Sequence, residues 1–178
     1  GYADVIVGAH IHTNGESSEG RAYVYFGSRD GLQQDAAWTV EGDQQGAELG
    51  DSVGTAGDVN GDGYADVIVG APGYDGGDPR EGRALVYHGS PSGLSEDLGW
   101  MASSDQTLSY FGCSVATAGD VNGDGHADVI VGARLYDNGQ QNEGMAFVFH
   151  GSAQGLPSEP DWTAESNNPG AHFSRSLH

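Results

Sequence analysis

The sequence predicts an all-β protein: a β-propeller made of blades of four antiparallel strands, with about three blades in the chain. Three observations predict this fold. The 178 residues repeat with a fixed period, short β-branched and aromatic segments recur within each period, and 31 glycines interrupt every window that a helical apolar stripe would need. A fixed long period is typical of arrays whose units bury their apolar faces against one another.

The period of the repeat is 62 residues. The segment GYADVIVGA that begins at Gly1 returns at Gly63 and, with His126 in place of tyrosine, at Gly125. Other markers keep this register, namely the Glu-Gly pairs at Glu19, Glu81 and Glu143 and the tryptophans Trp38, Trp100 and Trp162. We therefore expect one array over residues 1–178, with a partial repeat at 1–50, full repeats at 51–112 and 113–174, and the start of the next strand region at 175–178.

The central repeat contains four strand signals separated by turn residues. The first, 52–56, is small and apolar, and the second, 65–69, is β-branched. The third, 84–88, alternates with aromatic residues, and the fourth, 99–102, carries the tryptophan. Residues 67–69 are apolar on both faces of their strand, which is typical of a sheet packed between two others. Four-stranded sheets stacked in this way and arranged radially form a propeller.

The composition is strongly acidic, with 26 Asp and Glu against 6 Arg, no Lys and a net charge of −20. Binding to nucleic acid or to an anionic membrane needs a basic patch, which dispersed arginines do not supply, so we exclude these partners. The apolar runs are far shorter than the roughly 18 residues of a membrane helix, so we expect no membrane insertion. The acidity instead indicates bound cations, because carboxylates in a compact state repel one another.

An acidic loop lies between the first two strands of each complete repeat. It covers 58–66 and again 120–128, with oxygen-bearing side chains at loop positions 1, 3, 5 and 9 and glycine at position 6. Ca²⁺ takes about six to eight oxygen ligands, and this spacing wraps the side chains and the position 7 carbonyl around one point. The predicted metal ligands are Asp58, Asn60, Asp62, Tyr64 (through its carbonyl), Asp66, Asp120, Asn122, Asp124, His126 (through its carbonyl) and Asp128.

The loop is not an EF-hand. An EF-hand has a bidentate glutamate at position 12 and flanking helices, whereas position 12 here is Val69 or Val131, inside a strand signal. The last carboxylate comes at position 9 instead. A metal-free, Asx-rich turn is the alternative interpretation, and the presence of the same ligand types in both copies favours calcium.

These motifs resemble the FG-GAP repeat of integrin α subunits and of many bacterial secreted proteins. The residues that carry the resemblance are Phe111-Gly112 before an acidic loop and Gly70-Ala71-Pro72 after one. Other copies depart from the motif, with His10 and Arg134 in place of the proline, and Leu49-Gly50 and Phe173-Ser174 in place of the Phe-Gly pair. The resemblance covers all three copies. It implies a propeller, typically of seven blades, with calcium in the loops joining strands 1 and 2, an extracellular or cell-surface location, and a role in adhesion or ligand recognition.

The sequence offers little for catalysis. Residues 50–54 (GDSVG) match the G-x-S-x-G pattern of a hydrolase, which needs a strand, a strained turn and a helix around the serine. Ser52 instead lies in a strand signal, and Ser114 and Ser176 hold its place in the other repeats without the motif. No constellation of nucleophile, base and oxyanion donor stands outside the repeat pattern, so we expect a structural serine and no enzyme activity.

Three other residues were considered as ligands or nucleophiles. His10 and His12, two residues apart on an extended segment, could hold a transition metal, but the other copies lack them and no third ligand is evident. The single cysteine, Cys113, excludes an intrachain disulfide. The sister repeats have Asp51 and Arg175 in its place, so we do not expect a nucleophile there.

Two functions of different classes remain open at this point. The first is a noncatalytic, calcium-binding module for adhesion or for recognition of a protein ligand. The alternative is a carbohydrate-binding lectin propeller, or a propeller domain appended to a secreted enzyme. In a lectin Trp38, Trp100 and Trp162 would stack on sugars, whereas packing between blades is their competing role.

The two ends of the sequence bear on how the array closes. The chain opens inside an acidic loop that retains Asp4, and 173–178 corresponds to a first strand, so we expect a bacterial-type or engineered fragment with blades split across its ends. Exposed sheet faces and unpaired edges are rarely tolerated. We therefore expect a homo-oligomer in which two chains join head to tail into a six-bladed ring.

Overall fold

The computed structural model describes residues 2–177, and these residues form strands and turns without a helix. The prediction of an all-β fold is therefore confirmed. The strands are β1 (Val5–Ala9), β2 (Arg21–Tyr25), β3 (Gly27–Ser28), β4 (Gly31–Leu32), β5 (Trp38–Glu41), β6 (Val53–Gly57), β7 (Asp66–Ala71), β8 (Arg83–Tyr87), β9 (Trp100–Ser103), β10 (Phe111–Gly119), β11 (Asp128–Ala133), β12 (Met145–Phe149) and β13 (Trp162–Glu165).

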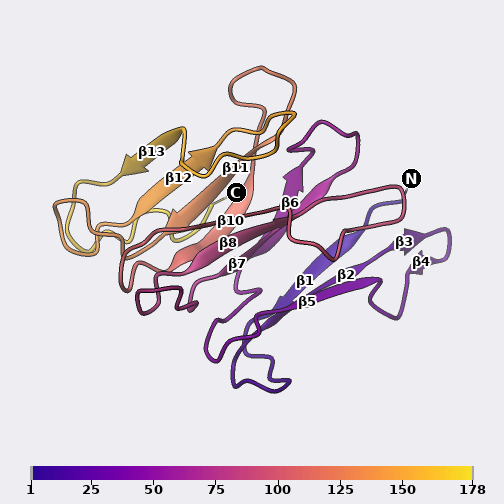
Figure 1. Ribbon diagram of the computed structural model, residues 1–178, viewed down its shortest axis with the longest axis horizontal. Helices are drawn as coiled ribbons and strands as arrows, with labels where there is room; N and C mark the ends of the chain where they lie inside the picture. Colours follow the sequence, from indigo (N-terminus) through magenta and orange to yellow (C-terminus); the bar gives the residue numbers. More distant parts are fainter. Residues whose placement is uncertain (1, 178) are drawn as a thin grey trace.

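Three antiparallel sheets form the blades and follow one another along the chain (Figure 1). Blade 2 consists of β6-β7-β8-β9 and blade 3 of β10-β11-β12-β13, each in chain order. Blade 1 consists of β1-β2-β5, and among the described residues it has no counterpart of β6. Strand β1, which corresponds to the second strand of a complete blade, therefore lies at the edge of its sheet. The four-stranded blades agree with the predicted propeller architecture.

Blade 2 buries apolar side chains on both of its faces. Ile68 and Val86 of blade 2 belong to the core shared with blade 3, whereas Val69 and Leu85 belong to the core shared with blade 1. Because side chains alternate across a strand, consecutive residues of one strand serve different cores. This explains why the sequence shows a continuous β-branched run rather than an apolar and polar alternation.

The tryptophans fasten each blade to the next one. Trp38 packs edge-on against Tyr87 at 4.9 Å between ring centroids, and its indole N–H donates to the carbonyl of Ser95 at 3.0 Å. Trp100 repeats both contacts one blade later, with Phe149 at 4.9 Å and the carbonyl of Pro157 at 2.7 Å. Trp162 in blade 3 is 52% exposed. The structure thus assigns the first two tryptophans to packing between blades.

Two local features differ from the sequence expectation. The hairpin of β3 and β4 in blade 1 was not expected; the hydroxyl of Ser28 closes it by donating to the carbonyl of Gly31 at 2.7 Å. Residues 173–177 form no strand, although they correspond to the first strand of a blade. A first strand pairs with the second strand of its own blade, as β6 pairs with β7, and the described residues hold no such partner for this segment. His178 lies outside the described residues.

Residues 173–177 nevertheless dock on blade 3 as the start of β10 docks on blade 2. The N–H of Phe173 donates to the carbonyl of Glu143 at 2.8 Å, and the N–H of Leu177 donates to Oγ of Ser114 at 2.8 Å. The corresponding bond from Val115 to Oγ of Ser52 is 3.0 Å long. The recurring serine is therefore a contact between blades, as the repeat pattern predicts.

Blade stacking depends on a close approach of backbones at Gly70. A Cβ atom built there would lie 1.9 Å from the carbonyl oxygen of Gly112 in the next blade. No side chain fits at that distance, so the strand and the following blade would have to separate. Gly8 stands in the same relation to Gly50.

We expect Gly70→Ala to destabilise the protein by about 1–3 kcal/mol, because the added methyl group meets backbone rather than a movable side chain. Urea unfolding measures the change. Gly77→Ala is the matched control, since a Cβ atom at Gly77 meets nothing within 4 Å and its φ is not positive. Equal midpoints for the two variants would contradict the proposed packing constraint.

Candidate metal centres in the acidic loops

The two acidic loops occupy equivalent places in blades 2 and 3. One joins β6 to β7 and the other joins β10 to β11, so both project from the same end of the sheets, at the top of Figure 1. Positive φ angles at the loop glycines turn the chain, for example +91° at Gly63 and +92° at Gly125. Glycine enters this region without the steric cost that a Cβ atom brings.

Three predicted ligands of the blade 2 loop gather over the turn. Asp58 accepts the N–H of Asp62 at 3.0 Å and the N–H of Gly63 at 2.8 Å. The side-chain amide of Asn60 donates to Asp62 at 3.0 Å, and Asp62 in turn accepts the N–H of Tyr64 at 2.9 Å. The carboxylates and the amide therefore face one another across positions 1, 3 and 5 of the loop.

The blade 3 loop repeats this arrangement. Asp120 accepts the N–H groups of Asp124 at 3.0 Å and Gly125 at 2.9 Å, and the amide of Asn122 donates to Asp124 at 2.9 Å. Asp124 also accepts the N–H of His126 at 2.9 Å. That bond, followed by the one from Asn122, lowers the pKa of Asp124 below its usual value. The carboxylate therefore stays ionised at neutral pH, and its Oδ1 lies 3.3 Å from Nδ1 of His126.

The carboxylate at position 9 is placed differently from the other three. Asp66 is fully buried, and its two oxygens accept the N–H of Gly89 at 2.8 Å and the N–H of Val59 at 2.9 Å. Asp128 makes the equivalent bonds in blade 3. These residues tie the loop to the end of the third strand. Within residues 2–177 the structure does not bring three carboxylates of either loop within 4.8 Å of one another.

The donor set fits a hard cation. The carboxylates of Asp58, Asp62 and Asp120 have no Arg or His ion-pair partner in the described part of the chain. Carboxylate, amide and carbonyl oxygens are the ligands that Ca²⁺ prefers. In both loops the position 3 amide donates its NH₂ group to the position 5 carboxylate, and its oxygen accepts the main-chain N–H of position 5. When bound, Ca²⁺ would supply the positive charge that the loops lack.

The loops of adjacent blades also touch, which the sequence did not indicate. The carbonyl of Asp58 accepts the N–H of Ala127 at 2.9 Å, and the carbonyl of Val59 accepts the N–H of Ser152 at 3.0 Å. A Cβ atom at Gly61 would lie 2.8 Å from the His126 ring. The blade 2 loop is therefore ordered partly by blade 3.

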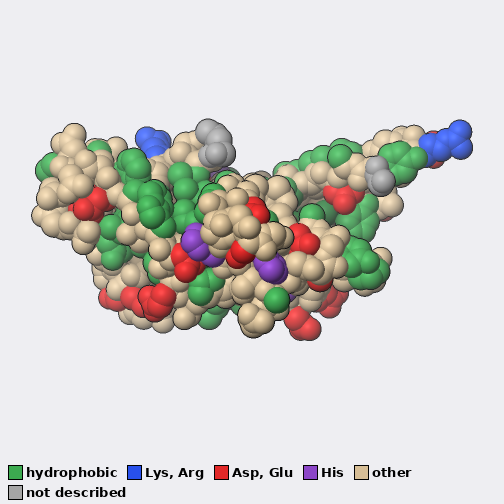
Figure 2. Space-filling view, turned by 90° about the horizontal axis from the view of Figure 1, so that it is seen from above, with side chains coloured by type: hydrophobic (Ala, Val, Ile, Leu, Met, Phe, Trp, Pro, Cys, Tyr) green, Lys and Arg blue, Asp and Glu red, His purple; other side chains and the backbone are tan. Residues whose placement is uncertain are grey.

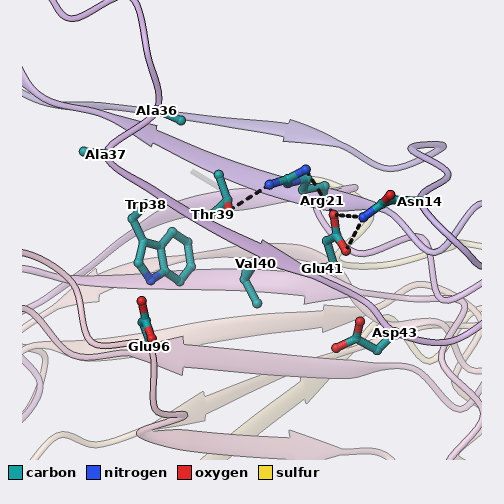
Figure 3. Close-up of a pocket in the computed structure, with 10 residues that line it drawn as sticks. All are labelled: Asn14, Arg21, Ala36, Ala37, Trp38, Thr39, Val40, Glu41, Asp43 and Glu96. Carbon is teal, nitrogen blue, oxygen red and sulfur yellow. Dashed lines mark hydrogen bonds and ion pairs between the residues drawn. The ribbon is translucent and has the colours of Figure 1, made fainter.

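Acidic side chains are far more numerous than basic ones over the rest of the surface. On the face in Figure 2, carboxylates are dispersed over the molecule, whereas arginine side chains show only at separate points. In blade 1, a hollow of about 630 Å³ is lined by Asn14, Arg21, Glu41 and Asp43, among others (Figure 3). Glu41 and Asp43, together with Glu19, form the group of three carboxylates within 4.8 Å that the described residues contain. Sequence reasoning missed this group, although Glu19 belongs to a recurring Glu-Gly pair.

The other residues considered from sequence do not form a shared site. His10 and His12 lie in the turn after β1 and face different carboxylates, Asp51 at 4.0 Å and Glu41 at 3.8 Å. Cys113 is buried, and this burial raises the pKa of its thiol. A thiol with a raised pKa is a poor nucleophile at neutral pH.

The repeats match a known family. Residues 49–87 and 111–149 match the FG-GAP repeat. Integrin alpha-PS2 of Drosophila melanogaster is 35% identical over 149 residues, which are 79% of this chain and 10% of that protein. Integrin alpha-5 of Xenopus laevis is 28% identical over 182 residues, 94% of this chain and 17% of that protein. The chain thus spans between 10% and 17% of the length of these relatives. No helix in the described residues is long and apolar enough to cross a membrane.

We expect Gly63→Val to weaken cation binding by the blade 2 loop about tenfold, because a β-branched side chain at positive φ strains the turn by roughly 1–2 kcal/mol. The cause is conformational alone, since a Cβ atom at Gly63 meets nothing within 4 Å. Calcium titration by calorimetry measures the affinity.

The matched control for this variant is Gly15→Val. Gly15 has φ +117° and equally free surroundings, but it lies in blade 1, outside the acidic loops. Calcium affinity should therefore be unchanged in that variant. An unchanged affinity in Gly63→Val as well would show that the loop does not bind the ion in this conformation.

Proposed function

Because the chain is an integrin-α-like array of FG-GAP repeats, we propose that it is a noncatalytic, extracellular recognition module that binds protein ligands and needs Ca²⁺ in its acidic loops. The observation that carries this proposal is the duplicated loop, in which two blades gather the same carboxylates and amide with equivalent bonds. A site that served one ligand-specific reaction would not need two identical copies. The integrin relatives support recognition of proteins as the role.

The contacts between blades favour this function over the alternatives. Trp38 and Trp100 are engaged by the following blade through their rings and their indole N–H groups, so they are not free to stack on sugars. The hydroxyl of Ser52 accepts the main-chain N–H of Val115 in the next blade. Ser52 therefore belongs to a contact between blades, and not to the strand-to-helix turn that a hydrolase nucleophile occupies. These observations support neither a lectin nor a hydrolase.

Removal of Ca²⁺ should lower the melting temperature and release the protein from a ligand-coated surface. If free Ca²⁺ stood about 100-fold above the dissociation constant, each occupied loop would add about 2.7 kcal/mol to the free energy of unfolding. Calorimetric melting with Ca²⁺ and with EGTA measures the stability. Adhesion of the immobilised protein to extracellular-matrix proteins under both conditions measures recognition.

The control is the double variant Asp58→Asn/Asp120→Asn, which keeps an acceptor oxygen at both positions but removes two charges. Its melting temperature should fall less on addition of EGTA than that of the wild-type protein. A wild-type protein that melts equally in both conditions would defeat the calcium proposal. Adhesion that persists in EGTA would defeat the dependence of recognition on the ion.

We also propose that the chain forms a head-to-tail dimer of six blades. Two open surfaces support this: β1 has a free strand edge with Val5 and Val7 40% and 44% exposed, and Trp162 is exposed at the other end of the array. Residues 173–177 already make the bonds that a first strand makes to the preceding blade.

Light scattering tests this association. A dimer should have twice the 18.4 kDa mass of the chain. Trp162→Ala should weaken the dimer, because it removes the indole that would pack against blade 1 of the second copy. A monodisperse 18.4 kDa species at micromolar concentration would overturn the proposal.

A further inference from the structure

Blade 3 holds two carboxylates at the end opposite its acidic loop. Glu143 lies just before β12 and is fully buried, and Glu165 is the last residue of β13. Asn138 links them, because its main-chain N–H donates to Oε1 of Glu143 and its side-chain amide donates to Oε2 of Glu165, both at 2.7 Å. The two carboxylates therefore lie on either side of one residue.

The second oxygen of Glu143 has no partner. Oε2 is buried and accepts no hydrogen bond, and the same holds for Oε1 of the nearby Gln140, whose N–H reaches Oε1 of Glu143 at 3.3 Å. Burial of an unpaired carboxylate oxygen is costly. Both unpaired atoms are hydrogen-bond acceptors. What this part of the structure lacks is therefore a hydrogen-bond donor or a positive charge.

Blade 1 shows how the same position is neutralised elsewhere. Glu19 and Glu41 are the repeat equivalents of Glu143 and Glu165, and their oxygens lie within 4.8 Å of each other and of Asp43. There Nη1 of Arg21 lies 3.1 Å from Glu41, a contact drawn in Figure 3. Nε2 of His12 lies 3.8 Å from the same carboxylate. The protein thus places its own cationic groups beside this pair.

Blade 3 replaces both of these basic residues. Met145 stands in the place of Arg21, and Tyr136 stands in the place of His12. Within residues 2–177 neither Glu143 nor Glu165 has an ion-pair partner. Blade 3 therefore keeps the carboxylates and loses the charge that balances them.

Blade 2 makes the opposite change. It keeps Glu81 and the arginine, but Ser103 replaces the second glutamate. Arg83, freed from an ion pair, stacks on Tyr74 at 3.7 Å from its ring centroid. Among the described residues, blade 3 alone combines the two carboxylates with no protein cation beside them.

We propose that a calcium ion binds blade 3 through Glu143 and Glu165, with the amide oxygens of Gln140 and Asn167 as further donors. Asn167 is the repeat equivalent of Asp43 in the blade 1 group. An all-oxygen set of two carboxylates and amides suits Ca²⁺, which accepts irregular protein cages, better than Mg²⁺, which demands octahedral geometry and retains water. The site is independent of the acidic loops, which lie at the other end of the blade.

Calorimetric titration with CaCl₂ in the Asp58→Asn/Asp120→Asn background tests the site without the loops. We expect one ion per chain to remain, and Glu143→Gln to abolish it. Glu81→Gln is the matched control, because it removes the equivalent glutamate from a blade without the second carboxylate, and it should leave the ion bound. No residual binding, or residual binding that Glu143→Gln leaves intact, would overturn the proposal.

Melting temperatures provide a second readout that does not depend on residual affinity. In EGTA, Glu143→Gln should melt no lower than its parent, since it removes an unbalanced buried charge, whereas in Ca²⁺ it should melt lower. A variant that melts lower under both conditions by the same amount would assign Glu143 a purely structural role and refute the site.

Crystals of the wild-type protein soaked with Tb³⁺ keep the question decidable if a variant fails to fold. Anomalous density between Glu143 and Glu165 supports the site. A Gln140 amide whose nitrogen donates to Oε2 of Glu143, with no density for an ion, overturns it. Absence of Tb³⁺ density at the acidic loops, with density present between Glu143 and Glu165, would contradict the proposed function and support this site.

Discussion

The packing of one blade against the next is the constraint on which the rest of the molecule depends. A four-stranded sheet with apolar side chains on both faces has no core of its own, so blade 2 shares one core with blade 1 and another with blade 3. The backbones approach so closely that only glycine fits at Gly70, against the carbonyl of Gly112. This contact joins the Gly-Ala pair of one repeat to the Phe-Gly pair of the next. It explains why the repeat motif has a glycine at both places.

Polar groups are arranged around this packing. Asp66 and Asp128 are buried where the loop, the second strand and the end of the third strand meet, and each satisfies main-chain N–H groups on two sides. The blade 2 loop then leans on blade 3 through the carbonyls of Asp58 and Val59. An ion bound as proposed would order the exposed half of these loops and would also stabilise the stacking beneath them. The proposed metal binding would therefore be coupled to blade assembly.

At the opposite end of the blades, the carboxylates are buried glutamates. A buried glutamate recurs there as Glu19, Glu81 and Glu143, and its carboxylate accepts main-chain N–H groups of the loop that precedes it. The neighbouring charges vary from blade to blade, because the arginine and the second glutamate are not always present together. With six basic residues against 26 acidic ones, this protein has few cationic side chains to place beside these carboxylates.

The sequence by itself determined the period, the strands of the central repeat to within two residues, and the residues of both acidic loops. These follow from local chemistry: β-branched runs, turn glycines and the spacing of oxygen donors. Tertiary structure decided the rest. Residues 173–177 match a strand pattern yet form none, because a strand needs a ladder partner. The buried place of Asp66, the contact of His126 with Gly61 and the unbalanced charge of Glu143 all arise between residues from different strands or blades, and no local pattern specifies which groups will meet there.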